Sequence, residues 1–108
     1  MPRYVLADGA EKDLEGIARY TIDHWGIDQA RTYGAAFARH FDSLQAGQVR
    51  SKVVFDHWAE LKFSRCQHHY VFSLNRDPEP LAILAVFHES MDLPARLRDR
   101  LGEDGTQV

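Results

Sequence analysis

Only one cysteine is present, Cys66, so no disulfide can form within the chain. Long apolar runs are also missing. The longest covers residues 81–87, whereas a membrane-spanning helix needs about 20 apolar residues. No stretch has the order of charged, apolar and small residues that marks a signal peptide. We therefore expect a soluble protein of a reducing compartment, with the cytoplasm as the default location.

Linker-like tracts, internal repeats and a basic excess are absent as well. A chain of 108 residues, 44% of them hydrophobic, suits one small domain. We place this domain at residues 1–101 and expect a flexible tail at 102–108. The formal charge of −3 argues against a free-standing nucleic-acid binder. A domain of this size buries limited surface on folding, so an obligate partner is plausible.

Positive charge is concentrated in the middle of the chain. The stretch from Arg50 to Arg76 contains five lysines and arginines but only Asp56 and Glu60 as acidic residues. Such a basic sheet on an otherwise acidic body suits an acidic partner or a phosphate backbone. An ordinary solvated sheet face explains the pattern equally well.

The first half of the chain predicts a strand followed by two helices. Residues 4–7 form a short apolar run, and Asp8 with Glu11 three residues later has the pattern of a capping box. Apolar residues then recur at helical spacing in two segments. Gly26 and Gly47 are the expected helix ends. The short connection at Gly26 predicts that the two helices pack antiparallel.

Helical spacing also predicts which side chains face inward. In the first helix, Trp25 belongs to the apolar stripe and Asp13 to the opposite, solvent-facing side. Asp28 is a candidate cap for the second helix. The apolar stripe of that helix comprises Ala30, Tyr33, Gly34, Phe37, Ala38, Phe41 and Leu44.

The second half of the chain changes to strand patterns. Strands are predicted at residues 53–55, 59–63, 70–74 and 81–87, with a turn at 75–80. Large residues alternate in 70–74, as in a strand that buries one face. Residues 81–87 are apolar throughout, which indicates a central strand covered on both faces. Asp92 then precedes a short helix over residues 94–101, and the whole order is typical of an α+β fold.

The histidines and Cys66 are candidates for a metal site or for a catalytic nucleophile. Cys66, His68 and His69 lie close together in sequence, and His57 and His88 are further candidate ligands. Adjacent side chains on a strand point to opposite faces, so His68 and His69 are not expected to converge. The spacing matches no structural zinc pattern, and Cys66 has no strained elbow around it. We expect no metal and no cofactor.

Four segments of the chain read Ala10-x-x-Asp13-Leu14-x-x-Ile17-x-x-Tyr20-Thr21, Trp25-Gly26-x-x-Gln29-Ala30-x-x-Tyr33, His69-x-Val71-Phe72, and Ile83-Leu84-x-Val86-x-His88-x-x-Met91-Asp92. In register, these segments resemble one family, the ParE toxins of the RelE/ParE superfamily. The resemblance extends over residues 4 to about 101, nearly the whole chain.

This resemblance implies a fold, a function and partners. The fold would be α+β, with an N-terminal strand, an antiparallel helix hairpin, an antiparallel sheet of three or four strands and a short C-terminal helix. The function would be that of a toxin in a type II toxin–antitoxin system, which inhibits DNA gyrase and is neutralised by a ParD-like antitoxin. Contact with DNA would be only indirect, through the antitoxin, and no membrane would be involved.

By their positions in the matched motifs, the residues expected to bind the target are Arg65, His69, His88, Met91 and Asp92, with the terminal helix over 94–101. Asp92 and Met91 also have structural explanations, as a helix cap and as packing.

Two other functions stay open. RelE-type relatives cleave messenger RNA on the ribosome, and Arg65, His69 and His88 would then act on phosphate and protons. A scaffold that binds antitoxin without toxicity is the other alternative. It is motivated by Ser73 and Ala85, which stand where the family usually has a tyrosine and a basic residue.

Overall fold

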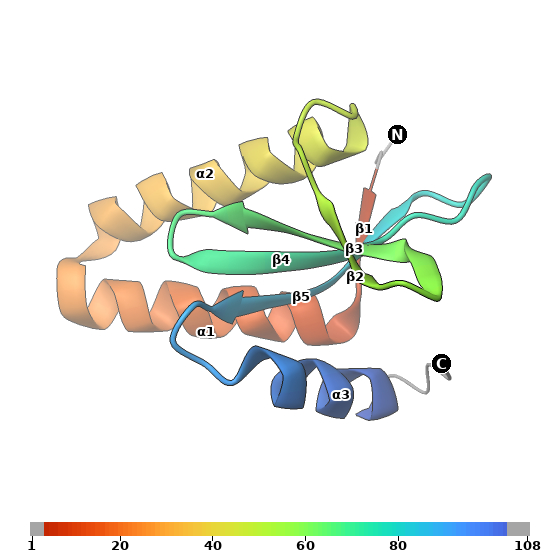
Figure 1. Cartoon of the computed structure of the whole chain (residues 1–108). Coiled ribbons are helices and arrows are strands. Elements are labelled where there is room, and N and C mark those ends of the chain that lie inside the picture. The colour runs from red at the N-terminus through yellow and green to blue at the C-terminus, as the bar shows by residue number, and fades with distance from the viewer. Residues whose placement is uncertain (1–3, 104–108) are drawn as a thin grey trace.

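The computed structural model describes residues 4–103. The elements in chain order are β1 (Tyr4–Leu6), α1 (Asp8–Trp25), α2 (Ile27–Gln45), β2 (Lys52–Phe55), β3 (Trp58–Cys66), β4 (His69–Leu74), β5 (Leu81–His88) and α3 (Leu93–Glu103). The predicted α+β class is confirmed (Figure 1). The helix at the C-terminal end is longer than the predicted 94–101, and the expected tail lies outside the described residues from residue 104 onward. Among the described helices, none is long and apolar enough to cross a membrane.

All five strands form one sheet in the order β1-β5-β4-β3-β2. β1 pairs with β5 in parallel, and the other neighbours are antiparallel. β5 therefore lies inside the sheet, and its residues Ile83 and Ala85 are 0% exposed. The prediction of a central strand covered on both faces is confirmed.

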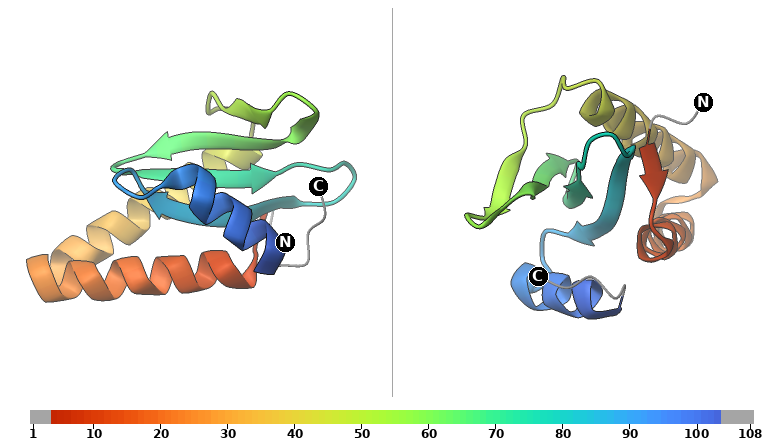
Figure 2. Two further views of the ribbon diagram at one scale, coloured as in Figure 1. Left: turned by 60° about the horizontal axis from the view of Figure 1, so that its bottom comes forward. Right: turned by 90° about the vertical axis from the view of Figure 1, so that its right-hand side faces the viewer.

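The sheet separates two apolar clusters. The α1–α2 hairpin lies on one side of the sheet and α3 on the other (Figure 2). The α1–α2 hairpin covers one face, where Phe37 and Phe41 of α2 pack against Val71 and Ile83 of the sheet. α3 lies on the other face, where its residue Leu97 joins the second cluster. We call these the hairpin face and the α3 face. Because α3 is a single short helix, part of the α3 face of β2, β3 and β4 has no helix above it.

The predicted caps at Asp8 and Asp28 are wrong. α1 begins at Asp8 itself, after Ala7, and no side chain caps it. The Ala7 N–H donates to the Ile83 carbonyl at 2.9 Å, so the strand pairing of β1 continues to the residue where the helix starts. α2 begins directly after Gly26, whose φ of 95° turns the chain between the helices. Gly26 as the end of α1 is confirmed.

Two predictions of side-chain orientation in α1 are also wrong. Trp25 is 72% exposed instead of buried. Asp13 points inward, where its carboxylate pairs with Arg100 of α3 at 2.8 Å. In β4, burial extends to both faces, since Val71, Phe72 and Ser73 are all buried. The prediction that this strand buries only one face is therefore wrong, because the α1–α2 hairpin also covers the face that carries Val71, opposite the face of Phe72.

Candidate functional site

An open groove of about 880 Å³ lies between the helix hairpin and the C-terminal end of β5. We call it the hairpin groove. Its lining residues are Lys12, Asp13, Gly16, Ile17, Tyr20, Thr21, Trp25, Gln29, Tyr33, His68, His69, Val86, His88, Ser90 and Met91. Three of the residues predicted to bind the target, His69, His88 and Met91, are thus brought together.

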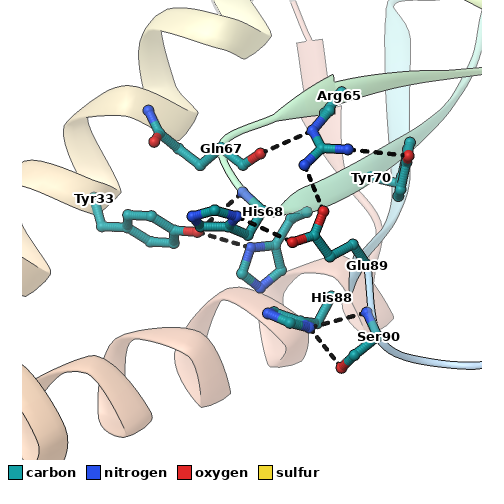
Figure 3. Close-up of polar contacts among 9 residues, drawn as sticks. Tyr33, Arg65, Gln67, His68, Tyr70, His88, Glu89 and Ser90 are labelled. Carbon is teal, nitrogen blue, oxygen red and sulfur yellow. Dashed lines mark hydrogen bonds and ion pairs between the residues drawn. The ribbon is translucent and has the colours of Figure 1, made fainter.

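Two histidines on neighbouring strands form the floor of this groove. His69 at the start of β4 is directly opposite His88 at the end of β5, and their rings lie 5.1 Å apart. The ring of His88 is oriented by Ser90, whose N–H donates to Nδ1 at 3.1 Å. Figure 3 shows Ser90 beside His88 and Tyr33 reaching in from α2.

Tyr33 links α2 to the floor through its hydroxyl group. The backbone N–H of His68 donates to the Tyr33 oxygen at 3.4 Å. The same oxygen lies 3.0 Å from Nδ1 of His69. In the tautomer of neutral His69 that carries its hydrogen on Nε2, Nδ1 accepts the hydrogen of the Tyr33 hydroxyl, while the Tyr33 oxygen accepts the N–H of His68.

Burial controls the ionisation of these two side chains. Desolvation, together with the neighbouring His88 and His68, lowers the pKa of His69 from 6.5 to about 4. Desolvation also raises the pKa of Tyr33 above its ordinary value. Both groups are therefore neutral near pH 7.

A chain of polar contacts lies next to this floor, at the ends of β3 and β5 (Figure 3). The carboxylate of Glu89 pairs with the Arg65 guanidinium on one oxygen and lies 3.1 Å from His68 Nδ1 on the other. Desolvation raises the pKa of Glu89, but the hydrogen bond from His68 and the charge of Arg65 outweigh it and bring the pKa below its ordinary value. Glu89 is thus ionised and bridges β3 to the β3–β4 turn.

Arg65 and Asp92 lie apart from the hairpin groove. Arg65 is opposite Tyr70 in the β3–β4 register, and its guanidinium lies 5.6 Å from the centre of the Tyr70 ring. Since Tyr70 packs on the α3 face, Arg65 belongs to that face as well. Asp92 precedes α3, and its Oδ1 accepts the Ala95 N–H at 3.3 Å. Its position is that of a helix N-cap.

Exposed apolar residues at the tip of the hairpin were not predicted as site residues. Tyr20 is 60% exposed, Trp25 72% and Ile27 55%. The 18 residues of α1 give a helix about 27 Å long. α1 starts beside Ile83, and β5 ends five residues later at His88, which is only about 17 Å of strand. The tip therefore extends past the sheet (Figure 1).

The length of the helix was readable from the sequence, but the point on β5 where the helix starts was not. The exposure of Trp25 depends on the length of α1 and on where α1 starts against β5. Helical periodicity contains neither the second quantity nor the length of the sheet, so it assigned Trp25 to the core.

A second groove, of about 480 Å³, lies on the other side of the sheet between α3 and the strands. We call it the α3 groove. It is lined by Val54, Phe55, Phe63, Tyr70, Phe72, Leu93, Pro94, Leu97 and Arg98. Its walls are almost entirely apolar, with the Arg98 side chain at the edge. Lys52 on β2 is opposite Phe63 in the register and so lies on the same face.

Cys66, Ser73 and Ala85 are all buried in the structure. Cys66 is 7% exposed, and burial raises the pKa of its thiol, which makes a reactive thiolate less accessible. Ser73 and Ala85 are 4% and 0% exposed, so neither is placed to touch a partner. Within residues 4–103, no three His, Cys, Asp or Glu side chains are grouped to hold a metal ion.

Comparison with known proteins identifies relatives of this arrangement. A family model described as the ParE toxin of the type II toxin–antitoxin system parDE matches residues 4–93. Toxin ParE of Escherichia coli is 45% identical over 101 residues, covering 94% of this chain and 98% of that protein. A solved chain from the chromosomal ParDE TA system of P. aeruginosa superposes with a TM-score of 0.65. It covers 79% of this chain and 92% of its own length at 13% identity, and so supports the fold alone.

Proposed function

The chain belongs to the family of ParE toxins of type II toxin–antitoxin systems, and on that premise we propose that it inhibits DNA gyrase by binding to it. In this proposal a ParD-like antitoxin neutralises the toxin. The observation that carries the target site is the hairpin groove, where His69, His88 and Met91 meet exposed aromatic side chains. We assign this groove to the target and the α3 groove to the antitoxin.

The exposed side chains of the hairpin tip favour a protein target. Trp25, Tyr20 and Met91 are 72%, 60% and 40% exposed around one groove. Clustered apolar surface of this kind marks interaction sites in soluble proteins. An aromatic side chain buries about 150–250 Å² when it is fully covered. Trp25 therefore has the properties of an interface hot spot, where a few large residues supply most of the binding energy.

Binding is favoured over RNA cleavage by the state of the residues that a nuclease would use. His69 has a pKa of about 4, far from the near-neutral value at which a general acid or base works best. Its Nδ1 is also engaged by Tyr33. Arg65 lies on the other face of the sheet and is paired with Glu89. Arg65 and His69 therefore do not converge on one phosphate position.

The α3 groove has the chemistry to receive an amphipathic antitoxin segment. Its floor and walls are apolar, and Arg98 and Lys52 place positive charge on the same face. β2 is an edge strand, with backbone groups open on one side. A helix in the groove or a strand added to β2 would both use these features. An acidic segment would match the charge of this face.

Expression of the chain alone in bacteria tests the function. Growth arrest, with loss of DNA supercoiling by purified gyrase, is the expected result. Arrest with normal supercoiling and cleaved transcripts would refute the proposal in favour of the nuclease. Absence of arrest would favour the scaffold instead.

Two variants test the assignment of the two grooves. Trp25→Ala should abolish inhibition of gyrase and leave antitoxin affinity unchanged, because Trp25 lies outside the α3 groove. Arg98→Glu should keep inhibition and weaken antitoxin binding by roughly tenfold, equivalent to about 1.4 kcal/mol. Both positions are exposed, so each variant is the folding control for the other. Loss of both activities in either variant would contradict separate sites.

A further inference from the structure

Arg100 joins α3 to α1 across the edge of β5. Its guanidinium makes a two-pronged contact with the carboxylate of Asp13, with both N···O distances at 2.8 Å. Nη1 also donates to the Leu84 carbonyl at 3.1 Å, and the guanidinium lies 5.1 Å from the centre of the Phe87 ring. The side chains of Asp13 and Arg100 are only 15% and 13% exposed. A bidentate pair with so little solvent around it has one defined geometry.

Asp13 and Arg100 supply hydrogen-bond partners to backbone groups of β5 beyond the end of its pairing with β1. β1 pairs with β5 only as far as Ile83. Beyond that point β1 no longer runs beside β5, and the register with β4 skips Leu84. Arg100 donates to the Leu84 carbonyl, and the Val86 N–H donates to Asp13 at 2.9 Å. Buried backbone groups need such partners, so both side chains are required where they stand.

Gly9 provides the space for the guanidinium. It lies in the first turn of α1, and a Cβ built at this position would be 2.8 Å from Cζ, Nε and Nη1 of Arg100. A side chain at this position therefore requires a shift, and the atoms in its way are those of the guanidinium that Asp13 and Leu84 hold. At Gly16, in the same helix, a Cβ would meet no atom within 4 Å.

We propose that Gly9, Asp13 and Arg100 form a latch that positions α3 on the sheet and thereby sets the shape of the α3 groove. None of the three lines this groove. Their effect on a partner is exerted through Leu93, Pro94 and Leu97, which form the wall that α3 contributes. The consequence for antitoxin binding rests on the function proposed above. The positioning of α3 does not.

Gly9→Ala is the sharpest probe of the latch, with Gly16→Ala as the matched control. Alanine favours helix over glycine, so both substitutions should stabilise α1 if only propensity matters. We expect Gly9→Ala instead to speed amide hydrogen exchange in residues 93–103 by at least tenfold. Gly16→Ala should leave exchange in this segment as in the parent.

Antitoxin affinity supplies the second measurement, taken well below the unfolding temperature of each variant. Gly9→Ala should lower the affinity for the cognate ParD-like antitoxin at least tenfold, and Gly16→Ala should not. Arg100→Lys should restore part of the affinity lost in Arg100→Ala, since lysine can still reach one carboxylate oxygen but not two.

If amide hydrogen exchange in α3 is as slow in Gly9→Ala as in the parent chain, the proposed latch is wrong. If exchange in α3 is faster but the affinity for the ParD-like antitoxin equals that of the parent, the latch does not set the shape of the α3 groove. If the parent chain itself binds no ParD-like protein, the proposed function fails, and the exchange rates alone decide the latch.

Discussion

The neutral, buried state of His69 predicts a distinct pH dependence of stability. His69 is 7% exposed and its Nδ1 accepts the Tyr33 hydroxyl. Protonation would remove this acceptor and place a charge beside His88, whose ring centre lies 5.1 Å away. Desolvation and these neighbours give His69 a pKa of about 4, against 6.5 for an ordinary histidine.

The magnitude follows from the difference between the two pKa values. As the pH falls below 6.5, the unfolded chain binds a proton at residue 69 while the folded chain does not, until the pH approaches 4. Stability is therefore full above pH 6.5 and is lost through this window. At about 1.4 kcal/mol per pKa unit, the loss in free energy of unfolding is about 3 kcal/mol.

Urea unfolding between pH 4 and pH 7 measures this loss. The parent should lose about 3 kcal/mol more than His69→Gln across the window. Glutamine retains a side-chain acceptor for Tyr33 but does not titrate. His40 has a pKa lowered by burial and acts in the same direction, but it is present in both proteins and cancels in the comparison. His24→Gln, on the exposed side of α1, is the control substitution. Equal pH slopes for the parent and His69→Gln would refute the reasoning.

Three further predictions concern stability. Leu61→Ala, at a position 0% exposed, should cost about 2–5 kcal/mol in urea unfolding because it leaves a cavity in the core; parental stability would place Leu61 outside the core. Gly26→Ala should cost about 1–3 kcal/mol through its backbone conformation of φ 95° and ψ 168° alone, since a Cβ there meets nothing within 4 Å; a stabilised variant would contradict the turn geometry. Asp13→Ala should cost about 3–5 kcal/mol because it leaves Arg100 without its carboxylate. Asp13→Asn should cost less, because its amide oxygen can still accept the Val86 N–H; a larger loss in Asp13→Asn would exclude this explanation.

Local patterns in the sequence were sufficient for the elements of the fold. The apolar run at residues 81–87 predicted a strand buried on both faces, and β5 is that strand. Gly26 predicted the corner between two helices, and its φ of 95° is one that glycine adopts easily. Phe37 and Phe41 were placed in the core by helical spacing, and both are 2% exposed. Each of these features depends on residues that are close together in the chain.

The candidate site was predicted less completely. The family motifs pointed to His69, His88 and Met91, which do meet in one groove. They also pointed to Arg65 and Asp92, which lie on the α3 face and at the start of α3. Arg65 is close in sequence to the motif that begins at His69, but the β3–β4 turn lies between them. Closeness in sequence therefore did not determine on which face of the sheet the Arg65 side chain lies.

Only the tertiary structure decided the roles of Trp25 and Asp13. Trp25 continues the apolar stripe of α1, yet it is exposed because the helix extends past the end of β5. Asp13 lies on the polar side of the same helix, yet it is buried because Arg100, 87 residues later in the chain, reaches it across the edge of the sheet. The sequence by itself determined the periodicity, and hence the helices, the strands and the family. Long-range packing determined where each helix begins against the sheet, and that position decides which of its faces meets solvent.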